Sequence, residues 1–339
     1  MATMQDVARH AGVSLSTVSY ALSGARPIGP ETRARVMAAI EELGFERNAA
    51  ARSLAARRSH VLALVLPTVA GGLSGTLGEF AQSASQTARD AGYHLVIWPF
   101  DREEHGEVRD LVRQGQADGV LVMEVSLHDE RIDALMASQV PFTMIGRTED
   151  LDGRSWVDID FERTLTDAVD HLADLGHTDV AFVNHSQRSL DTGYGPTVRA
   201  RDAFLAAAAA RGIHGTDVTS DESPLAGRLA TSAILDERPG TTAFVTMNET
   251  ATFGVTQALR DRRLRVPDDV SVLAVVTSPE VGAMYNPPLT TMRAPGRELG
   301  RRSVEELLAA LEGTTYREAP RLVTCVLSPG ASTGPAPRR

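Results

Sequence analysis

Four side chains that could bind a small polar molecule follow apolar runs that resemble β-strands. They are Trp98, Glu124, Arg147 and Asn248. Because ligands of open α/β sheets bind outside the carboxyl ends of the strands, we expect these residues to meet at one site. The indole could stack on an apolar ring face, and the other three side chains could hydrogen-bond hydroxyl groups. Two alternatives stay open: Trp98 as part of the core, and Glu124 with Arg147 as an ion pair at the rim.

The segments that would position these residues alternate between apolar runs and helix-like stretches. The expected strands are 61–66, 93–98, 119–123, 142–145, 179–183, 243–247 and 270–276, and expected helices include 161–175, 198–211 and 249–261. Such alternation is typical of parallel sheets covered by helices. The two series predict an α/β core of two lobes with a cleft between them.

Another kind of chemistry, contact with DNA, is predicted near the amino terminus. Thr3 with Asp6 can cap one short helix, Ser14 can cap a second, and Gly12 supplies the bend between them. Apolar residues recur at helical spacing on both sides of that bend, namely Val7, Ala8, Ala11, Val18, Ala21 and Leu22. The pattern predicts a helix-turn-helix whose second helix reads DNA, with an ordinary helical hairpin as the alternative.

A third helix completes the small all-α head. Pro30 opens it, Gly44 ends it, and Val36, Ile40 and Leu43 form its core face.

Length and composition bound the classes of protein. The 339 residues exceed one compact core, so two or three domains are expected. No apolar run is long enough to cross a bilayer, and no charged-then-apolar leader opens the chain, so we expect a cytoplasmic protein with no membrane partner. The single cysteine, Cys325, excludes an intrachain disulfide, and its apolar surroundings predict burial.

Charge is distributed unevenly along the chain. Residues 1–58 hold eight Arg and five acids, a charge of +3, which leaves −13 for the rest of a chain whose net charge is −10. A basic head on an acidic body fits a small DNA-binding unit whose body is repelled by phosphate.

Catalytic motifs are absent from the sequence. His94, His171, His177 and His185 do not form a His-Glu-x-x-His pattern, and the glycines at 72, 75 and 78 lack the spacing of a dinucleotide loop. We therefore expect no enzyme activity, no metal site and no cofactor.

Several motifs together resemble one family, the lactose-repressor/galactose-repressor (LacI/GalR-type) transcription regulators. They are Asp6-Val7-Ala8, Ala11-Gly12-Val13-Ser14, Thr17-Val18-Ser19, His171-Leu172, Leu175-Gly176-His177, Val266-Pro267-Asp268-Asp269-Val270-Ser271 and Pro288-Leu289-Thr290-Thr291. The resemblance covers roughly residues 2–330 and implies a periplasmic-binding-protein-like core behind the helix-turn-helix head.

The resemblance also implies a division of the chain. A helix-turn-helix domain would span 1–46, a hinge helix 47–59, an amino-terminal lobe 60–160 with 291–320, a carboxy-terminal lobe 161–290 with 321–330, and a tail 331–339. The chain would cross between lobes near 160–162, 288–291 and 320–324. The tail has no heptads, so a homodimer is expected rather than a coiled-coil tetramer.

DNA contacts follow from the same resemblance. Base contacts would come from Leu15, Ser16 and Tyr20, and phosphate contacts from Ser14, Thr17, Ser19, Ser23, Thr32 and Asn48. Packing of Tyr20 against the third helix is the alternative for that residue. In the hinge, Ala51, Leu54 and Ala55 would face the minor groove, and paired Leu54 side chains would wedge into a base step and kink the DNA, unless the segment is an ordinary connector.

The family pattern is less complete at the ligand site. Asn248 matches a family Asn, and Asp160 lies at the first expected crossing. Arg199 is a near candidate for an Arg that clasps sugar hydroxyls, with Arg201 weaker. Val276 stands where the family usually has a sugar-binding acid, and a valine cannot accept a hydroxyl hydrogen bond. The effector is therefore expected to be an unusual sugar or sugar derivative, another polar metabolite, or absent.

Together these features predict a dimeric transcription repressor on a palindromic double-stranded DNA operator, controlled by a small-molecule effector in the cleft. The alternatives are a solute-binding protein without a DNA role and a regulator that needs no effector.

Overall fold

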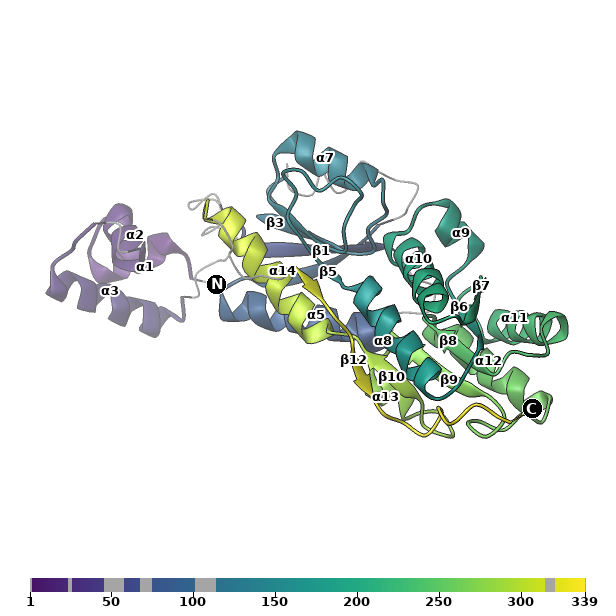
Figure 1. Cartoon of the computed structure of the whole chain (residues 1–339). Coiled ribbons are helices and arrows are strands. Elements are labelled where there is room, and N and C mark those ends of the chain that lie inside the picture. Colours follow the sequence, from purple (N-terminus) through teal and green to yellow (C-terminus); the bar gives the residue numbers. More distant parts are fainter. Residues whose placement is uncertain are drawn as a thin grey trace. The chain divides into compact units, whose positions relative to one another are not determined.

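The chain forms two compact units, residues 1–59 and 60–339. The computed structural model describes residues 2–23, 26–45, 58–67, 75–100, 114–314 and 321–338 (Figure 1). The boundary between the units falls at the predicted end of the hinge segment, and most of that segment lies outside the described residues.

The first unit is a three-helix bundle. Its helices are α1 (Met4–Ala11), α2 (Leu15–Ser23) and α3 (Pro30–Leu43). Thr3 and Asp6 cap α1 reciprocally, and Gly12 ends it in the left-handed region at φ 64°. Val7, Val18 and Val36 are fully buried where the three helices meet. The predicted helix-turn-helix head is therefore present.

One lobe of the second unit is built on an entirely parallel sheet. Its strand order is β11-β5-β4-β3-β1-β2. The strands are β1 (Val61–Pro67), β2 (His94–Phe100), β3 (Gly119–Val122), β4 (Phe142–Ile145), β5 (Trp156–Ile159) and β11 (Leu322–Val323). Helices α5 (Gly75–Asp90) and α14 (Gly296–Leu311) cover one face, and α7 (Glu130–Ser138) covers the other (Figure 1).

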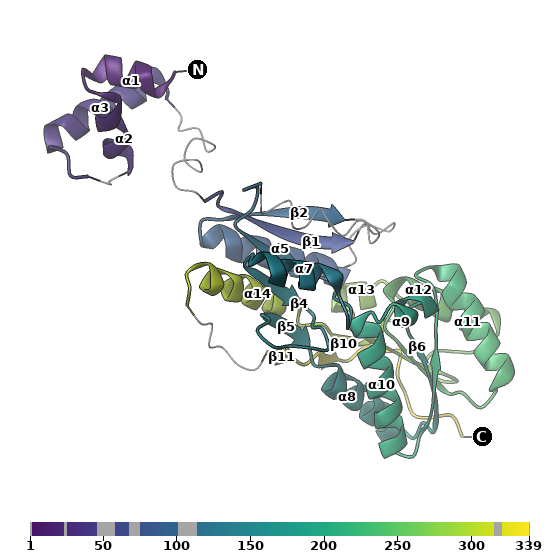
Figure 2. The same ribbon diagram turned by 90° about the horizontal axis from the view of Figure 1, so that it is seen from above.

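The other lobe repeats this arrangement with one antiparallel edge. Its order is β12-β10-β9-β8-β6-β7, and only β12 runs against its neighbour. The strands are β6 (Asp179–Val183), β7 (His214–Val218), β8 (Ala243–Thr246), β9 (Ser271–Val275), β10 (Thr290–Arg293) and β12 (Val326–Ser328). The helices are α8 (Phe161–Asp174), α9 (Gln187–Asp191), α10 (Gly195–Ala210), α11 (Pro224–Glu237), α12 (Glu249–Asp261) and α13 (Pro279–Gly282) (Figure 2).

Burial on both faces explains why these strands are visible in the sequence. Helices α8 and α10 cover one face of the second sheet and α11 and α12 the other, so central strands need apolar side chains in both directions. The seven predicted strands are all present. The edge strand β7 escaped prediction because its sequence, His-Gly-Thr-Asp-Val, is only partly buried and mostly polar.

Two predicted lobe boundaries are wrong. Residues 291–293 were assigned to the amino-terminal lobe, but they belong to β10, which pairs with β9 in the second sheet. Residues 322–323 were assigned to the carboxy-terminal lobe, but they form β11, which pairs with β5 in the first sheet. The second crossing therefore follows Arg293, and the third lies between Val323 and Val326. Such short strands carry little pattern, and only pairing decides their sheet.

The tail at 331–338 is part of the second lobe. Ser332 is fully buried, its hydroxyl donates to the carbonyl oxygen of Val272, and it accepts from the backbone of Thr290. The backbone of Gly334 donates to Ser271, and the Gly334 carbonyl accepts from the ring of His177. The segment predicted as a tail thus packs against the beginnings of β9 and β10.

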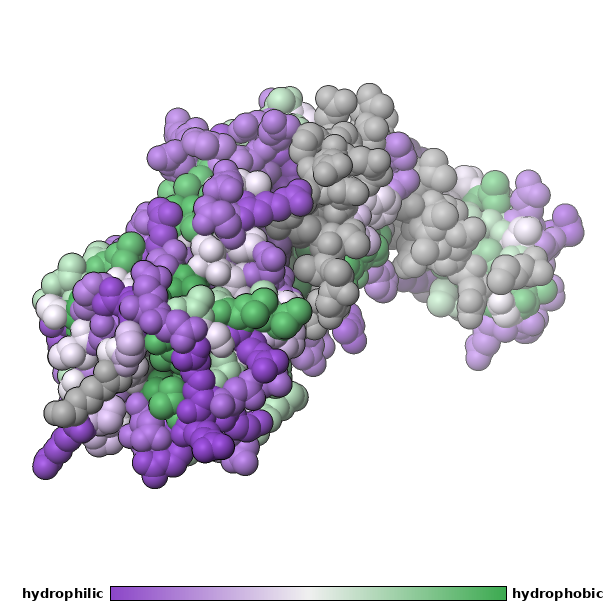
Figure 3. All heavy atoms as spheres, turned by 90° about the vertical axis from the view of Figure 1, so that its right-hand side faces the viewer, coloured by the Kyte–Doolittle hydropathy of each residue, from purple (hydrophilic) through white to green (hydrophobic). Residues whose placement is uncertain are grey.

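Polar side chains cover most of the face shown in Figure 3, with apolar side chains in separate patches. None of the helices in the described ranges is long and apolar enough to span a bilayer. Cys325 is buried as predicted, and burial raises the pKa of its thiol to about 12.

Candidate functional site

The amino-terminal end of α2 presents a cluster of hydroxyls. The Oγ of Ser14 accepts from the backbone N–H of Thr17 at 3.1 Å, which caps the helix, and it lies 2.8 Å from the hydroxyls of Ser16 and of Thr17. Leu15, the first residue of α2, is 46% exposed although it is apolar. An exposed leucine among hydroxyls at a helix amino terminus leaves this face suited to contact with DNA.

The other residues predicted to touch DNA lie on the same small unit or outside the described part. Ser19, Tyr20 and Thr32 are half-buried. The guanidinium of Arg26 lies 5.6 Å from the centre of the Tyr20 ring, within the range of a cation–π contact. Ser23 ends α2, but its side chain is not among those described. Four further predicted residues lie wholly outside the described part of the chain: Asn48, Ala51, Leu54 and Ala55.

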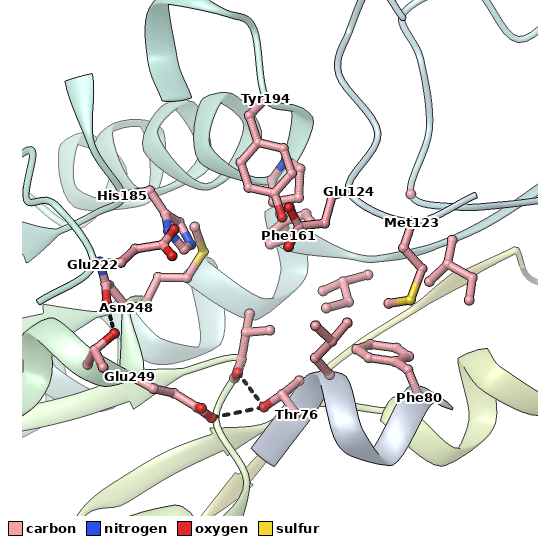
Figure 4. A pocket seen from close by; sticks show the side chains of 18 of the residues that line it. Thr76, Phe80, Met123, Glu124, Phe161, His185, Tyr194, Glu222, Asn248 and Glu249 are labelled. Atoms are coloured by element: carbon pink, nitrogen blue, oxygen red, sulfur yellow. Dashed lines mark hydrogen bonds and ion pairs between the residues drawn. The ribbon is translucent and has the colours of Figure 1, made fainter. Parts of the chain in front are cut away.

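A cavity of about 500 Å³ lies between the two lobes of the second unit (Figure 4). Thr76 and Phe80 on α5 and Glu124 after β3 form its wall on the first lobe. The second lobe contributes residues that follow its strands and begin its helices, among them His185, Tyr194, Glu222, Asn248 and Glu249. The cavity therefore forms where the carboxyl ends of two parallel sheets face each other, as the strand pattern predicts.

Two of the six predicted ligand-binding residues line this cavity. Glu124 does so from a left-handed backbone conformation at φ 53°. Asn248 is almost fully buried, and it uses its side chain to cap α12: Oδ1 accepts from the backbone N–H of Ala251 at 3.0 Å, and Nδ2 donates to the carbonyl of Ser220 at 3.4 Å. Its Oδ1 and one N–H of its amide are therefore engaged within the wall.

The remaining four predicted residues lie behind or away from the wall. Trp98 is half-buried against the cluster of Ala63, Val65 and Val120, which corresponds to the core alternative. Asp160 caps α8 by accepting from the backbone of Arg163 at 2.9 Å. These two side chains are held by packing and by the cap respectively, so neither is directed into the cavity by its contacts.

Arg147 and Arg199 converge on a residue that the sequence reasoning missed, Asp158. Nε of Arg147 and Nη1 of Arg199 each lie 3.7 Å from Oδ2 of Asp158, so the suggested pair of Arg147 with Glu124 is replaced by a pair with Asp158. Burial raises the pKa of the Asp158 carboxyl to about 6, against the two guanidinium groups that lower it. Its signal in the sequence is an acid inside the otherwise apolar strand β5.

The Arg199 side chain also ties the lobes together. Its Nη2 donates to the carbonyl of Arg147 at 2.6 Å. Gly195 makes room for it, because a Cβ at that position would collide with Nη1 of Arg199 and would lie 2.9 Å from the carbonyl oxygen of Val125. Next to this contact, backbone bonds join Leu127 to Gly193 and Gly195 to Val125, at 2.8 Å and 3.1 Å.

A second link between the lobes lies at the opposite part of the cavity. The hydroxyl of Thr76 is 3.0 Å from Oε1 of Glu249 and 3.1 Å from the carbonyl oxygen of Val276 (Figure 4). Burial raises the pKa of Glu249. Val276 adopts φ 55°, a conformation that a β-branched residue rarely takes. Backbone strain of this kind gathers at ligand sites and switch regions.

Comparison with known proteins gives two family matches. Residues 3–48 match the model described as bacterial regulatory proteins, lacI family, and residues 169–333 match the periplasmic binding protein-like domain. The first match covers the three-helix unit and the second covers most of the carboxy-terminal lobe.

Relatives of known activity match over nearly the whole length. The HTH-type transcriptional regulator AglR of Rhizobium meliloti is 29% identical over 99% of this chain and 95% of its own length. The ribose operon repressor of Escherichia coli is 29% identical over 96% of this chain and 98% of its own. A structure of the Lac repressor dimer bound to operator and the anti-inducer ONPF is 25% identical, with a TM-score of 0.85 over 98% of this chain and 99% of that one.

Both family matches, these relatives and the shared fold point the same way. The helix-turn-helix unit, the two parallel-sheet lobes and the cavity between them occur in one chain in the order found in these regulators. The chain thus carries a lacI-family DNA-binding domain followed by a periplasmic-binding-protein-like domain, and the relatives that it resembles over nearly its whole length are transcription regulators.

Proposed function

We propose that this chain is a transcription repressor that binds operator DNA as a homodimer and that a small polar ligand in the interlobe cavity controls this binding. The observation that carries the proposal is a cavity walled by both lobes in a chain whose amino-terminal unit is a helix-turn-helix. The relatives are transcription regulators, which agrees with the expectation that the chain is not an enzyme.

DNA binding would use the exposed start of α2. Leu15, Ser16 and Tyr20 would contact base edges in the major groove, and hydroxyls such as those of Ser14 and Thr17 would contact phosphates and set the register. The structural neighbour is a dimer bound to operator. A dimer of this chain would present two copies of α2 to two half-sites, so a palindromic operator is expected.

The segment 47–59 would transmit the signal. If paired Leu54 side chains wedge into the minor groove, the distance between the two copies of this segment in the dimer controls how well the side chains fit. The ligand would act by preferring one arrangement of the lobes, since only a difference in affinity between two states can shift their populations. The links through Thr76 and Arg199 join the lobes around the cavity and would differ between such states.

A footprint on DNA tests the proposal. The full chain should protect a symmetric site upstream of a gene in its own genome, and Ser16→Glu should abolish that protection, because a carboxylate on α2 would meet the electronegative groove. The matched control is Ser232→Glu on α11, far along the chain in the second lobe. An asymmetric footprint, or one that Ser16→Glu leaves unchanged, would contradict the proposed DNA contact.

The ligand is tested by adding the small-molecule fraction of a cell extract to the same footprint. A change in protection supports control by a metabolite. Protection that no fraction alters would favour the alternative of a regulator without an effector.

A further inference from the structure

Two helices from different lobes begin next to each other at the cavity. Helix α5 of the first lobe begins at Gly75, and α12 of the second lobe begins at Glu249. The Glu249 carboxylate accepts from the hydroxyl of Thr76 at 3.0 Å (Figure 4). We propose that Glu249 is a latch: its side chain holds the start of α5 against the second lobe, and a ligand of the cavity regulates the chain by acting on this contact.

The carboxylate of Glu249 receives donors from both lobes. Besides the Thr76 hydroxyl, the backbone N–H groups of Gly75 in the first lobe and of Ser278 in the second hydrogen-bond it. Hydrogen bonds to a carboxylate are roughly twice as strong as those between neutral groups. The negative charge also lies at the positive end of the α5 helix dipole. One side chain of the second lobe therefore caps a helix of the first.

Gly75 lets the two lobes approach closely at this point. A Cβ there would lie 2.7 Å from Cγ2 of Val281 and 3.4 Å from Oγ of Ser278, both in the second lobe. The first distance is too short for two carbon atoms, so no side chain fits. Gly78, three residues further along α5, differs, because a Cβ there would have no described heavy atom within 4 Å. The close approach is therefore confined to the start of the helix.

The latch is part of the cavity wall. Thr76, Glu249, Val276 and Val281 all line the cavity. The Thr76 hydroxyl also lies 3.1 Å from the carbonyl oxygen of Val276, the residue in the left-handed conformation. A ligand bound here would touch the groups that join the lobes, so it could favour one arrangement by adding to these hydrogen bonds or by competing for them. This regulatory consequence rests on the proposed function, whereas the latch itself does not.

The distance between the lobes tests the latch in the full chain, without DNA or added ligand. Nitroxide labels on Ala137→Cys in α7 and Ala233→Cys in α11 report on the two lobes, since both positions are exposed. The native thiol of Cys325 is buried and should not react. Labelled chain is mixed with an excess of unlabelled chain, so that a dimer carries at most one labelled copy. Double electron–electron resonance then gives the distribution of distances.

Shortening the latch should open the lobes. Glu249→Asp keeps an acid in the first turn of α12 but ends one methylene short of Thr76. We expect the mean label distance to increase by at least about 2 Å, the scale of domain rearrangements in proteins. Glu162→Asp is the matched control, the same change at an exposed position in the first turn of α8, and should leave the distances unchanged. Distances in Glu249→Asp equal to those of the natural chain would exclude the latch.

A second variant tests the contact from the first lobe. Gly75→Ala leaves Glu249 in place but puts a Cβ against Val281, so it should lengthen the label distance as well. Gly78→Ala is its control on the same helix, because that Cβ meets open space among the described residues. The pair decides the question if Glu249→Asp lowers the stability of the chain. Equal distances in the two alanine variants would contradict the latch.

The outcome is separable from that of the proposed function. Longer distances in Glu249→Asp with an unchanged DNA footprint would support the latch and contradict the proposed coupling between the lobes and DNA. A footprint that a metabolite alters, together with unchanged distances in Glu249→Asp, would do the reverse.

Discussion

Nη1 of Arg199 and Oδ2 of Asp158 lie 3.7 Å apart, and the two residues belong to different lobes. Both atoms are buried and neither has a hydrogen-bond partner among the described residues. The separation is too long for a hydrogen bond, so the pair attracts through charge alone. The strength of this link therefore depends on whether Asp158 is ionised.

The pH dependence of stability tests the environment of Asp158. Its pKa is about 6 in the folded chain because burial disfavours the charge, against 3.8 for an ordinary Asp. A carboxyl group whose pKa is higher in the folded than in the unfolded chain favours folding at low pH. This stabilisation is complete at pH values below the pKa of the unfolded chain, and it is lost as the pH rises through the pKa of the folded chain. From pH 7 to pH 4.5 the natural chain should gain about 2 kcal/mol of unfolding free energy relative to Asp158→Asn.

Denaturant unfolding at the two pH values, followed by tryptophan fluorescence, measures that difference. Both tryptophans lie in the first lobe, and Trp156 belongs to the same strand as Asp158. Other carboxyls titrate alike in both chains and cancel. The raised pKa would be contradicted if the unfolding free energy of the natural chain, measured relative to that of Asp158→Asn, stayed constant or fell between pH 7 and pH 4.5.

The hydroxyl of Thr76 should hold α5 against the second lobe. Thr76→Val keeps the shape but leaves the carbonyl of Val276 and the carboxyl of Glu249 without this partner, at a cost of roughly 1–3 kcal/mol. Amide hydrogen exchange around residues 277–282 should therefore become faster. Thr76→Ser retains the hydroxyl and is the control; equal exchange in the two variants would show that the hydroxyl does not link the lobes.

Ser14 should have two separable roles in α2. Ser14→Ala removes the cap to the N–H of Thr17 and should destabilise the three-helix unit by about 1 kcal/mol. Ser14→Asp keeps a cap and a favourable charge at the helix amino terminus, so stability should be retained while DNA binding falls through repulsion by phosphate. Circular dichroism on heating and binding to the protected DNA give the two readouts. Undiminished DNA binding by Ser14→Asp would show that no DNA phosphate lies next to Ser14.

Leu54→Ala should weaken binding to the operator while the two lobes stay folded. The reason is the loss of the apolar wedge proposed for the minor groove, where opening a base step costs a few kcal/mol that only an inserted side chain offsets. Leu229→Ala on α11, where the side chain is largely exposed, is the matched control. Fluorescence anisotropy with the protected DNA measures both. An unchanged affinity for Leu54→Ala would exclude the wedge.

Local patterns in the sequence were sufficient for the head and for the central strands. The caps at Thr3 and Ser14 and the bend at Gly12 involve residues close in sequence, so their hydrogen bonds follow from spacing. Strands such as β3 and β8 are buried on both faces and therefore appear as apolar runs. The docking of the tail left no such signal, because Ser332 and Gly334 bond to strands far away in the sequence.

The cavity, too, is predicted only in part from local sequence. Strand ends predict which segments reach the cavity, and Glu124 and Asn248, which follow strands, do line it. They do not predict that Asn248 caps a helix, or that Arg147 and Arg199 turn toward Asp158. The sequence by itself determined the family pattern, the order of elements and the edge at which a ligand binds, because these depend on local spacing and burial. Only the tertiary structure decided which charges face each other, because that depends on how two lobes, between which the chain crosses three times, bring distant side chains together.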